Sequence, residues 1–172
     1  MKKIISLITL TVLLFVSCKK TDTMALLSKK PNQTGINISS SENIELIKKM
    51  VDQVTKFNMV DFRSNFAPSA ILHDNRKNLT VDENVKMLED LKAKGIVFTM
   101  GKEPLIWEVI NDKPDTKTGV TNYVISFYET TFTKGTKSVV IVYNMNFAMK
   151  DGKIQEEWDM YDSADLVKLI NE

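Results

Sequence analysis

The hydrophobic period of this chain changes near Gly95, and this change constrains the fold more than any other feature. Between residues 39 and 95, apolar residues recur every three or four positions, which is typical of amphipathic helices. From Ile96 to Tyr161, apolar and polar residues alternate, as they do in strands with one buried face. We therefore predict an α+β domain in which helices pack on one face of a long, curled antiparallel sheet.

The helices are predicted from apolar stripes and from capping residues. Ser39 followed by Glu42, and Thr80 followed by Glu83, match the capping-box pattern that starts a helix. The predicted helices cover 39–57, 59–66, 80–95 and 163–170.

The strands are predicted from two-residue alternation between turn residues. Gly135 and Gly152 lie in short polar turns, so that the last three strands form an antiparallel meander. The predicted strands cover 70–74, 96–100, 105–110, 120–133, 137–149 and 153–161.

The N-terminus has the pattern of an export signal. Lys2 and Lys3 precede an apolar run over 4–16, and the small residue Ser17 follows it. The ending at residues 15–18 resembles the lipobox of bacterial lipoproteins, in which the cysteine becomes the acylated first residue. The resemblance implies a lipidated Cys18, with palmitate among its acyl chains, in a protein of the bacterial cell envelope anchored to a membrane on its periplasmic side or at the cell surface. The alternative is an ordinary secretory signal that is cleaved elsewhere.

This pattern divides the chain into three parts: a signal peptide at 1–17, the acylated cysteine with a flexible tether at 18–40, and a domain at 41–172. Residues 19–40 are mostly polar and show no hydrophobic period, which favours a tether.

Charge and composition exclude several classes of function. All 22 acidic residues lie beyond residue 17, whereas Lys2 and Lys3 are two of the 23 basic ones, so the processed chain carries a net charge of −1. This balance argues against nucleic acid as a partner. With its one cysteine lipidated and His73 as its sole histidine, the chain lacks the residues for a thiol nucleophile or a zinc site. We expect neither a metal nor a cofactor.

Two stretches, 66–74 and 147–159, resemble the nuclear transport factor 2-like superfamily, as does the order of the predicted elements over about 41–172. Members include ketosteroid isomerase, scytalone dehydratase and the SnoaL-like polyketide cyclases. The resemblance implies a cone-shaped, curved antiparallel sheet with the N-terminal helices on its concave face. The superfamily uses one scaffold for many functions, so the resemblance specifies the fold better than the reaction.

The resemblance also indicates where chemistry would take place. Asp74 falls where ketosteroid isomerase has its proton-shuttling aspartate, and Asp159 falls on the pocket side of the last long strand. Met50 and Met145 fall where that enzyme has its hydrogen-bond donors, so a steroid isomerase is not expected, because those donors stabilise the developing negative charge.

Strand alternation gives a compatible prediction from the residues themselves. It places Glu157, Asp159 and Tyr161 on one face of their strand, with Ile154 and Trp158 on the other. A buried carboxylate in an apolar pocket has a raised pKa and can act as a general acid or base. The candidate catalytic residues are Asp74 and Asp159, and the candidate ligand-binding residues are Glu157, Tyr161, Tyr143, Met145 and Phe147. Alternatively, these acids are solvated or lie in turns, and the aromatic residues are core.

Three functions remain open. The first is a membrane-anchored domain that binds a small, mostly apolar organic ligand. The second is a cyclase, isomerase or dehydratase that acts on a carbonyl compound with Asp74 and Asp159 as acid and base. The third is a non-catalytic interaction module. Convergence of two carboxylates in one cavity would favour the enzyme, and a solidly packed cone would favour the interaction module. A homodimer through the sheet face that bears Trp158 is a further expectation.

Overall fold

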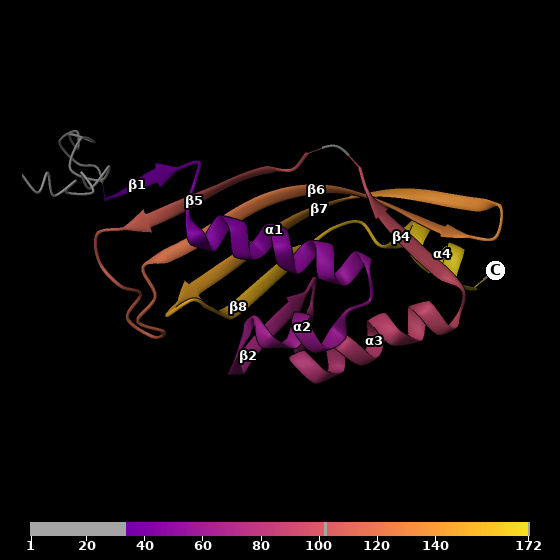
Figure 1. The fold of residues 1–172 in the computed structure, drawn as a ribbon, viewed down its shortest axis with the longest axis horizontal. Helices are drawn as coiled ribbons and strands as arrows, with labels where there is room; N and C mark the ends of the chain where they lie inside the picture. Colours follow the sequence, from indigo (N-terminus) through magenta and orange to yellow (C-terminus); the bar gives the residue numbers. More distant parts are fainter. Residues whose placement is uncertain (1–33, 102, 172) are drawn as a thin grey trace, which may run out of the picture. The chain divides into compact units, whose positions relative to one another are not determined.

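Eight strands form one large curved sheet, and helices cover one of its faces (Figure 1). The computed structural model describes residues 34–101 and 103–171. The predicted signal peptide, Cys18 and the tether up to residue 33 lie outside the described residues. The strands are β1 (Gly35–Ile38), β2 (Phe66–Asp74), β3 (Lys77–Thr80), β4 (Ile96–Met100), β5 (Leu105–Asn111), β6 (Asn122–Lys134), β7 (Lys137–Lys150) and β8 (Lys153–Met160).

The strand order is β1-β5-β6-β7-β8-β2-β3, and β4 pairs with β6 beyond the end of β5. All neighbours are antiparallel except β2 and β8, which run parallel. The predicted α+β class is confirmed, but the sheet is not entirely antiparallel as expected. Two short strands, β1 and β3, were also not predicted. Because β1 pairs with β5, Gly35–Ile38 belongs to the sheet and not to the tether.

Four helices complete the described part: α1 (Glu42–Thr55), α2 (Met59–Ser64), α3 (Val81–Ala93) and α4 (Ala164–Asn171). The predicted capping box of α3 is present, with Thr80 and Glu83 bonding each other's backbone N–H groups. The predicted cap of α1 is wrong: the N-cap is Ser41, whose Oγ accepts a hydrogen bond of 3.1 Å from the backbone N–H of Ile44. None of the described helices is long and apolar enough to cross a membrane.

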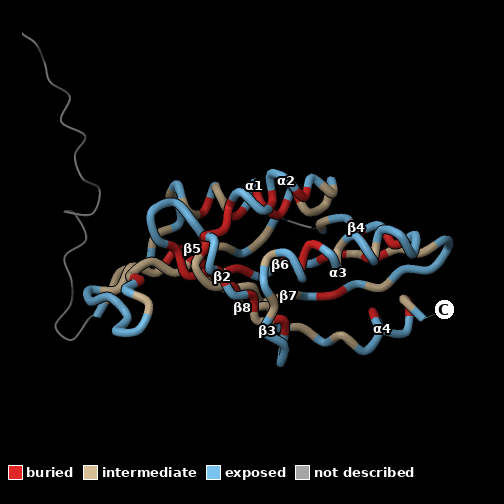
Figure 2. Tube along the Cα trace, turned by 90° about the horizontal axis from the view of Figure 1, so that it is seen from below, coloured by how far each residue is buried: buried red, intermediate tan, exposed pale blue. Residues whose placement is uncertain are grey.

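The main core lies between the helices and the sheet. Helices α1, α2 and α3 lie on one face, here called the inner face, and buried residues gather where α1 faces the sheet (Figure 2). Ile44 and Ile47 of α1 are fully buried against Phe147 of β7, among others. Burial of apolar side chains of this size stabilises the fold by about 1.5–3 kcal/mol each.

One detail of register differs from simple alternation. A β-bulge shifts the pairing of β7 and β8 between Ala148 and Met149. The bulge brings Ile154 to the inner face, where it is fully buried in the same core as Phe147, whereas alternation had placed it with Trp158 on the outer face. Beyond the bulge, Glu157 and Asp159 keep their predicted inner positions, opposite Phe147 and Met145.

Candidate functional site

A cavity of about 760 Å³ lies on the inner face. Residues of all four described helices and of six strands or strand ends line it, and most of its lining is apolar. Its methionines, whose flexible thioether side chains adapt to irregular shapes, are Met50, Met87, Met100, Met145 and Met160. The volume lies in the range of cavities that bind small organic molecules. The cone is therefore not packed solid.

Asp74 and Asp159 meet at one side of this cavity because of the parallel pairing of β2 and β8. The two residues are direct partners in the register, on strands whose axes lie about 4.8 Å apart. Asn75 joins the end of β2 to the end of β8 by two hydrogen bonds. Its backbone N–H donates to the carbonyl oxygen of Asp159 at 2.8 Å, and its Oδ1 accepts from the backbone N–H of Tyr161 at 3.2 Å. Both candidate catalytic residues line the cavity.

Glu157 adds a third carboxyl group two residues before Asp159, on the same face. It is 3% exposed and lies in register between Leu72 and Phe147, both fully buried side chains. Burial raises the pKa of Glu157 well above its usual range, and the neighbouring charge of Asp159 raises it further. No described residue forms an ion pair with Glu157 at close range.

Burial raises the pKa of Asp159 to about 7; the hydrogen bond with Glu157 lowers this pKa, whereas the charge of Asp74 raises it. Two adjacent carboxyl groups in an apolar site cannot both ionise easily, so they share a proton. We infer that Glu157 holds this proton and donates it to the Asp159 carboxylate. The pair therefore carries about one negative charge near neutral pH.

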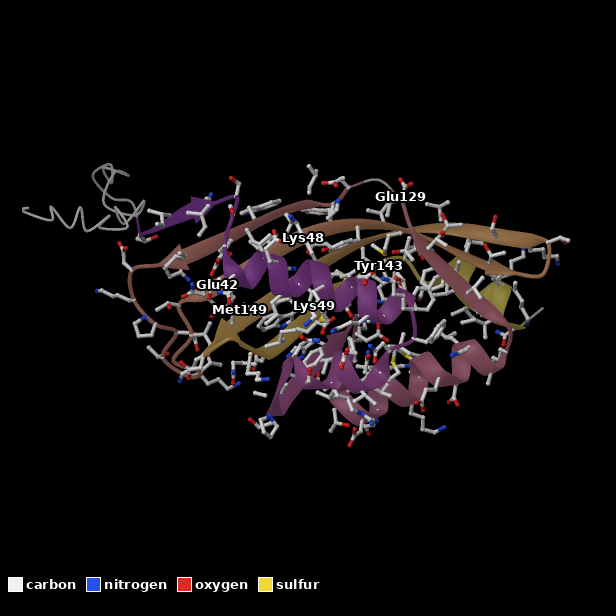
Figure 3. The ribbon with its side chains drawn as sticks, in the orientation of Figure 1. Glu42, Lys48, Lys49, Glu129, Tyr143 and Met149 are labelled. Carbon is white, nitrogen blue, oxygen red and sulfur yellow. The ribbon has the colours of Figure 1, made fainter. Side chains whose placement is uncertain are left out.

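Two tyrosines stand beside the carboxyl groups. The rings of Tyr143 and Tyr161 lie 4.3 Å apart between centroids, and Figure 3 shows Tyr143 on the helix-covered side of the sheet. Burial raises the pKa of both hydroxyl groups. The charge of Asp74 and a hydrogen bond with it contribute to the shift at Tyr161. Both tyrosines are therefore neutral donors at physiological pH.

One oxygen of each carboxyl group is buried without a hydrogen-bond partner among the described residues: Oδ1 of Asp74, Oε2 of Glu157 and Oδ1 of Asp159. Buried polar atoms are nearly always hydrogen-bonded in native proteins, because an unmade bond costs about 1–3 kcal/mol. Three such atoms on one cavity are unusual in a purely structural cluster. They are polar atoms with which a ligand can form hydrogen bonds.

Most candidate ligand-binding residues reach the cavity, but one does not. Tyr143, Met145, Glu157 and Tyr161 line it. Phe147 is instead fully buried in the core and is not part of the lining.

One polar lining residue was not predicted from the sequence. Asn84 of α3 is 7% exposed and faces the cavity. The signal was present, because Asn84 lies at helical spacing from Val81 and Leu88, within an otherwise apolar stripe.

The two positions at which the resemblance to ketosteroid isomerase would place hydrogen-bond donors also lie on the cavity. Met50 and Met145 both line it, so neither position supplies a hydrogen bond to a developing oxyanion. Within the part of the chain that the structure describes, no three His, Cys, Asp or Glu side chains are arranged to hold a metal ion.

No protein-family model matches the sequence, and no curated protein matches it. Solved structures do resemble the fold, at low sequence identity. A proposed polyketide cyclase from Xanthomonas campestris pv. campestris superposes with a TM-score of 0.58 at 9% identity, over 75% of this chain and 96% of its own. A nuclear transport factor 2-like protein of unknown function from Burkholderia pseudomallei gives 0.57 at 11%, over 77% and 100%.

An LEH-like epoxide hydrolase from M. tuberculosis gives a TM-score of 0.53 at 14% identity, over 76% of this chain and 90% of its own. Similarity at this level of identity concerns the fold and not the reaction. Together with the mixed α+β architecture and the curved sheet, it shows that this chain has the fold of the nuclear transport factor 2-like proteins, including SnoaL-like polyketide cyclases.

Proposed function

We propose that this domain is an acid–base enzyme that acts on a small, mostly apolar organic compound, with a cyclase-, isomerase- or dehydratase-type reaction at a carbonyl group. The observation that carries the proposal is the convergence of Asp74 and Asp159 on one apolar cavity, with Glu157 behind them. Two carboxyl groups with different environments can take the roles of base and acid.

Asp74 is the proposed base. Its buried, unpartnered oxygen is available to take a proton from a carbon next to the carbonyl group. Asp159, whose pKa of about 7 suits proton exchange near neutral pH, is the proposed acid, and Glu157 supplies the shared proton. Proton transfer to the carbonyl oxygen leaves a neutral enol, which needs no separate oxyanion donors. Tyr143, Tyr161 and Met145 would orient the substrate.

A binding protein without turnover is the second candidate, favoured by the five methionines of the lining. Methionine-rich surfaces accept ligands of varied shape. The unpartnered carboxyl oxygens favour the enzyme over this alternative, since a simple apolar carrier gains nothing from buried acids that cost desolvation energy.

The test is deuterium exchange at carbon, followed by NMR, in a panel of cyclic ketones and β-dicarbonyl compounds incubated with the full chain in deuterated buffer. Asp74→Asn should abolish any enzyme-dependent exchange and preserve the shape of the side chain. Asp151→Asn is the matched control, because Asp151 is exposed in a turn with φ of 53° that asparagine tolerates. Exchange that survives Asp74→Asn would overturn the role of Asp74.

We also propose that the protein is a lipoprotein anchored in the bacterial envelope through Cys18. Cys18→Ser should release the chain from membranes or leave it unprocessed. Unchanged membrane attachment of this variant would contradict the proposal.

The outer sheet face is the proposed homodimer surface. Trp158 stacks on His73 there, at 5.3 Å between ring centroids, and Phe127 stacks on Trp107 at 6.0 Å. Exposed apolar residues of this face include Leu105, Val140 and Val142. Exposed apolar residues that gather on one surface mark interaction sites. Light scattering that shows a monomer at high concentration would remove the dimer.

A further inference from the structure

We propose that the natural ligand of the cavity is an organic cation: a molecule with an apolar body and one protonated nitrogen, held by Asp74 and Asp159. The inference rests on the proposed function in that it takes the same cavity as the binding site and the same base, Asp74, but it replaces the carbonyl group of the substrate by a protonated imine.

Among the residues that the structure describes, the carboxyl cluster has no counter-ion. None of the ion pairs found among the described residues includes Asp74, Glu157 or Asp159. His73 pairs in register with Trp158 and stacks on it, on the opposite face of the sheet. A buried negative charge without a partner is strongly unfavourable, whereas a paired one is tolerated. A cationic ligand supplies the missing partner.

Basic residues near the cavity do not fill this role. Arg76 and Lys77 line the cavity but are exposed, Arg76 in the turn after β2 and Lys77 as the first residue of β3. Exposed charges are screened by solvent and salt, so they contribute little to the potential at buried groups. The carboxyl oxygens, by contrast, are fixed inside: Oδ1 of Asp74 and Oδ1 of Asp159 are both buried, and neither has a hydrogen-bond partner in the part of the chain that the structure describes.

The remainder of the cavity fits the apolar part of such a ligand. Phe98, Phe132 and Tyr143 present aromatic surface, and the methionines add flexible apolar walls. Aromatic faces also attract cations, by about 0.5–2 kcal/mol. Apolar walls with acceptors confined to one side indicate an amphipathic ligand and not a uniformly polar one.

A protonated nitrogen also suits the proposed chemistry at a site without oxyanion donors. In a protonated imine, the C–H bond next to the C=N carbon breaks, and its proton goes to Asp74. The electron pair of that bond forms a C=C bond, and the π electrons of the C=N bond neutralise the nitrogen. Asp159 pairs with the nitrogen in the charged state. The methionines at positions 50 and 145 are then no disadvantage.

The test compares three probes with the same body: 4-phenylbutylamine, 4-phenylbutan-1-ol and 4-phenylbutanoate. Binding to the full chain is measured by isothermal titration calorimetry at pH 7.5, with a protein-free blank. We expect the amine to bind at least about tenfold tighter than the alcohol, and the carboxylate to bind weakest, because buried charge complementarity decides the order. Asp74→Asn and Asp159→Asn should each reduce this preference, whereas Asp151→Asn should leave it unchanged.

The outcomes distinguish a failure of the cation inference from a failure of the proposed function. Similar affinities for all three probes, or tightest binding of the carboxylate, would overturn the cation inference and leave the cavity as a binding site. A failure of all three probes to bind would overturn the inference as well. If Asp74→Asn also had no effect in the deuterium-exchange assay, the proposed function would fall with it. Thermal melting of each variant verifies that a lost preference is not lost folding.

Discussion

Two buried glutamates on the inner face of the sheet have opposite surroundings. Glu108 of β5 is 1% exposed, and its Oε1 accepts hydrogen bonds of 2.6 Å from the side-chain amides of both Asn43 and Asn122. Glu157 of β8 is 3% exposed, but its Oε2 has no partner among the described residues, and the charged group that raises its pKa is another acid, Asp159. Burial alone therefore does not mark a functional carboxyl group. A buried carboxyl oxygen that lies beside a cavity and has no hydrogen-bond partner does mark one.

The largest expected effect concerns activity and distinguishes the acids of the cavity from Glu108. Asp159→Asn should lower the rate of proton transfer by about 10²–10⁴-fold, because it removes an acid that exchanges protons near neutral pH. Glu108→Gln should leave the rate near that of the unaltered protein. The measurement is the exchange assay described above, applied to both variants. Equal losses in the two variants would show that folding and not chemistry is being measured.

The next effect concerns stability, for which Glu108 should matter more than Glu157. Glu108→Leu leaves the half-buried amide groups of Asn43 and Asn122 without their acceptor and should lower the free energy of unfolding by about 3 kcal/mol. Glu157→Leu removes an acid that lacks compensation and should leave this free energy unchanged or raise it by about 1 kcal/mol. Urea denaturation of both variants measures the difference. A larger loss from Glu157→Leu than from Glu108→Leu would reverse the comparison.

The third effect is the pH dependence of stability. The pKa of Asp159 rises from 3.8 to about 7 on folding, and that of Glu157 also rises, so the folded state binds more protons than the unfolded state between about pH 4 and 7. The free energy of unfolding should therefore fall as the pH rises through this window, by on the order of 2 kcal/mol. The variant Glu157→Leu should flatten the decline. A stability that rises steadily from pH 4 to 7 in both proteins would contradict the shared proton.

The smallest effect tests the start of α1, which carries Met50 toward the cavity. Ser41→Ala should cost about 1 kcal/mol, because the cap to Ile44 is lost, whereas Ser39→Ala should cost close to nothing. Thermal unfolding of the two variants distinguishes them. A larger loss from Ser39→Ala would restore the cap that the sequence pattern suggested.

Local patterns predicted the long elements well. The alternation of β6 and β7 and the capping box of α3 are local signals, and the structure confirms both. The short strands β1 and β3 escaped prediction because four residues carry too little periodicity, and their existence depends on partners distant in sequence. Ser39 and Ser41 both precede an apolar stripe, and only the backbone conformation decides between them.

For the site, sequence reasoning found the participants but not their arrangement. Alternation placed Glu157 and Asp159 on one face, and the resemblance pointed to Asp74. The contact between Asp74 and Asp159 depends on the parallel pairing of β2 with β8, which joins residues 85 positions apart and leaves no local signal. The bulge that moved Ile154 inward and the displacement of Phe147 from the cavity are likewise products of packing.

The central claim is that Glu157 and Asp159 share a proton inside the cavity, and a carboxyl-carbon NMR titration of the ¹³C-labelled chain tests it most directly. We predict one carboxyl resonance that titrates near pH 7 and a second that titrates well above the usual range of a glutamate, both absent or shifted in Glu157→Gln. If every carboxyl group instead titrates below about pH 5, as unperturbed Asp and Glu do, the shared proton and the acid–base site built on it are contradicted.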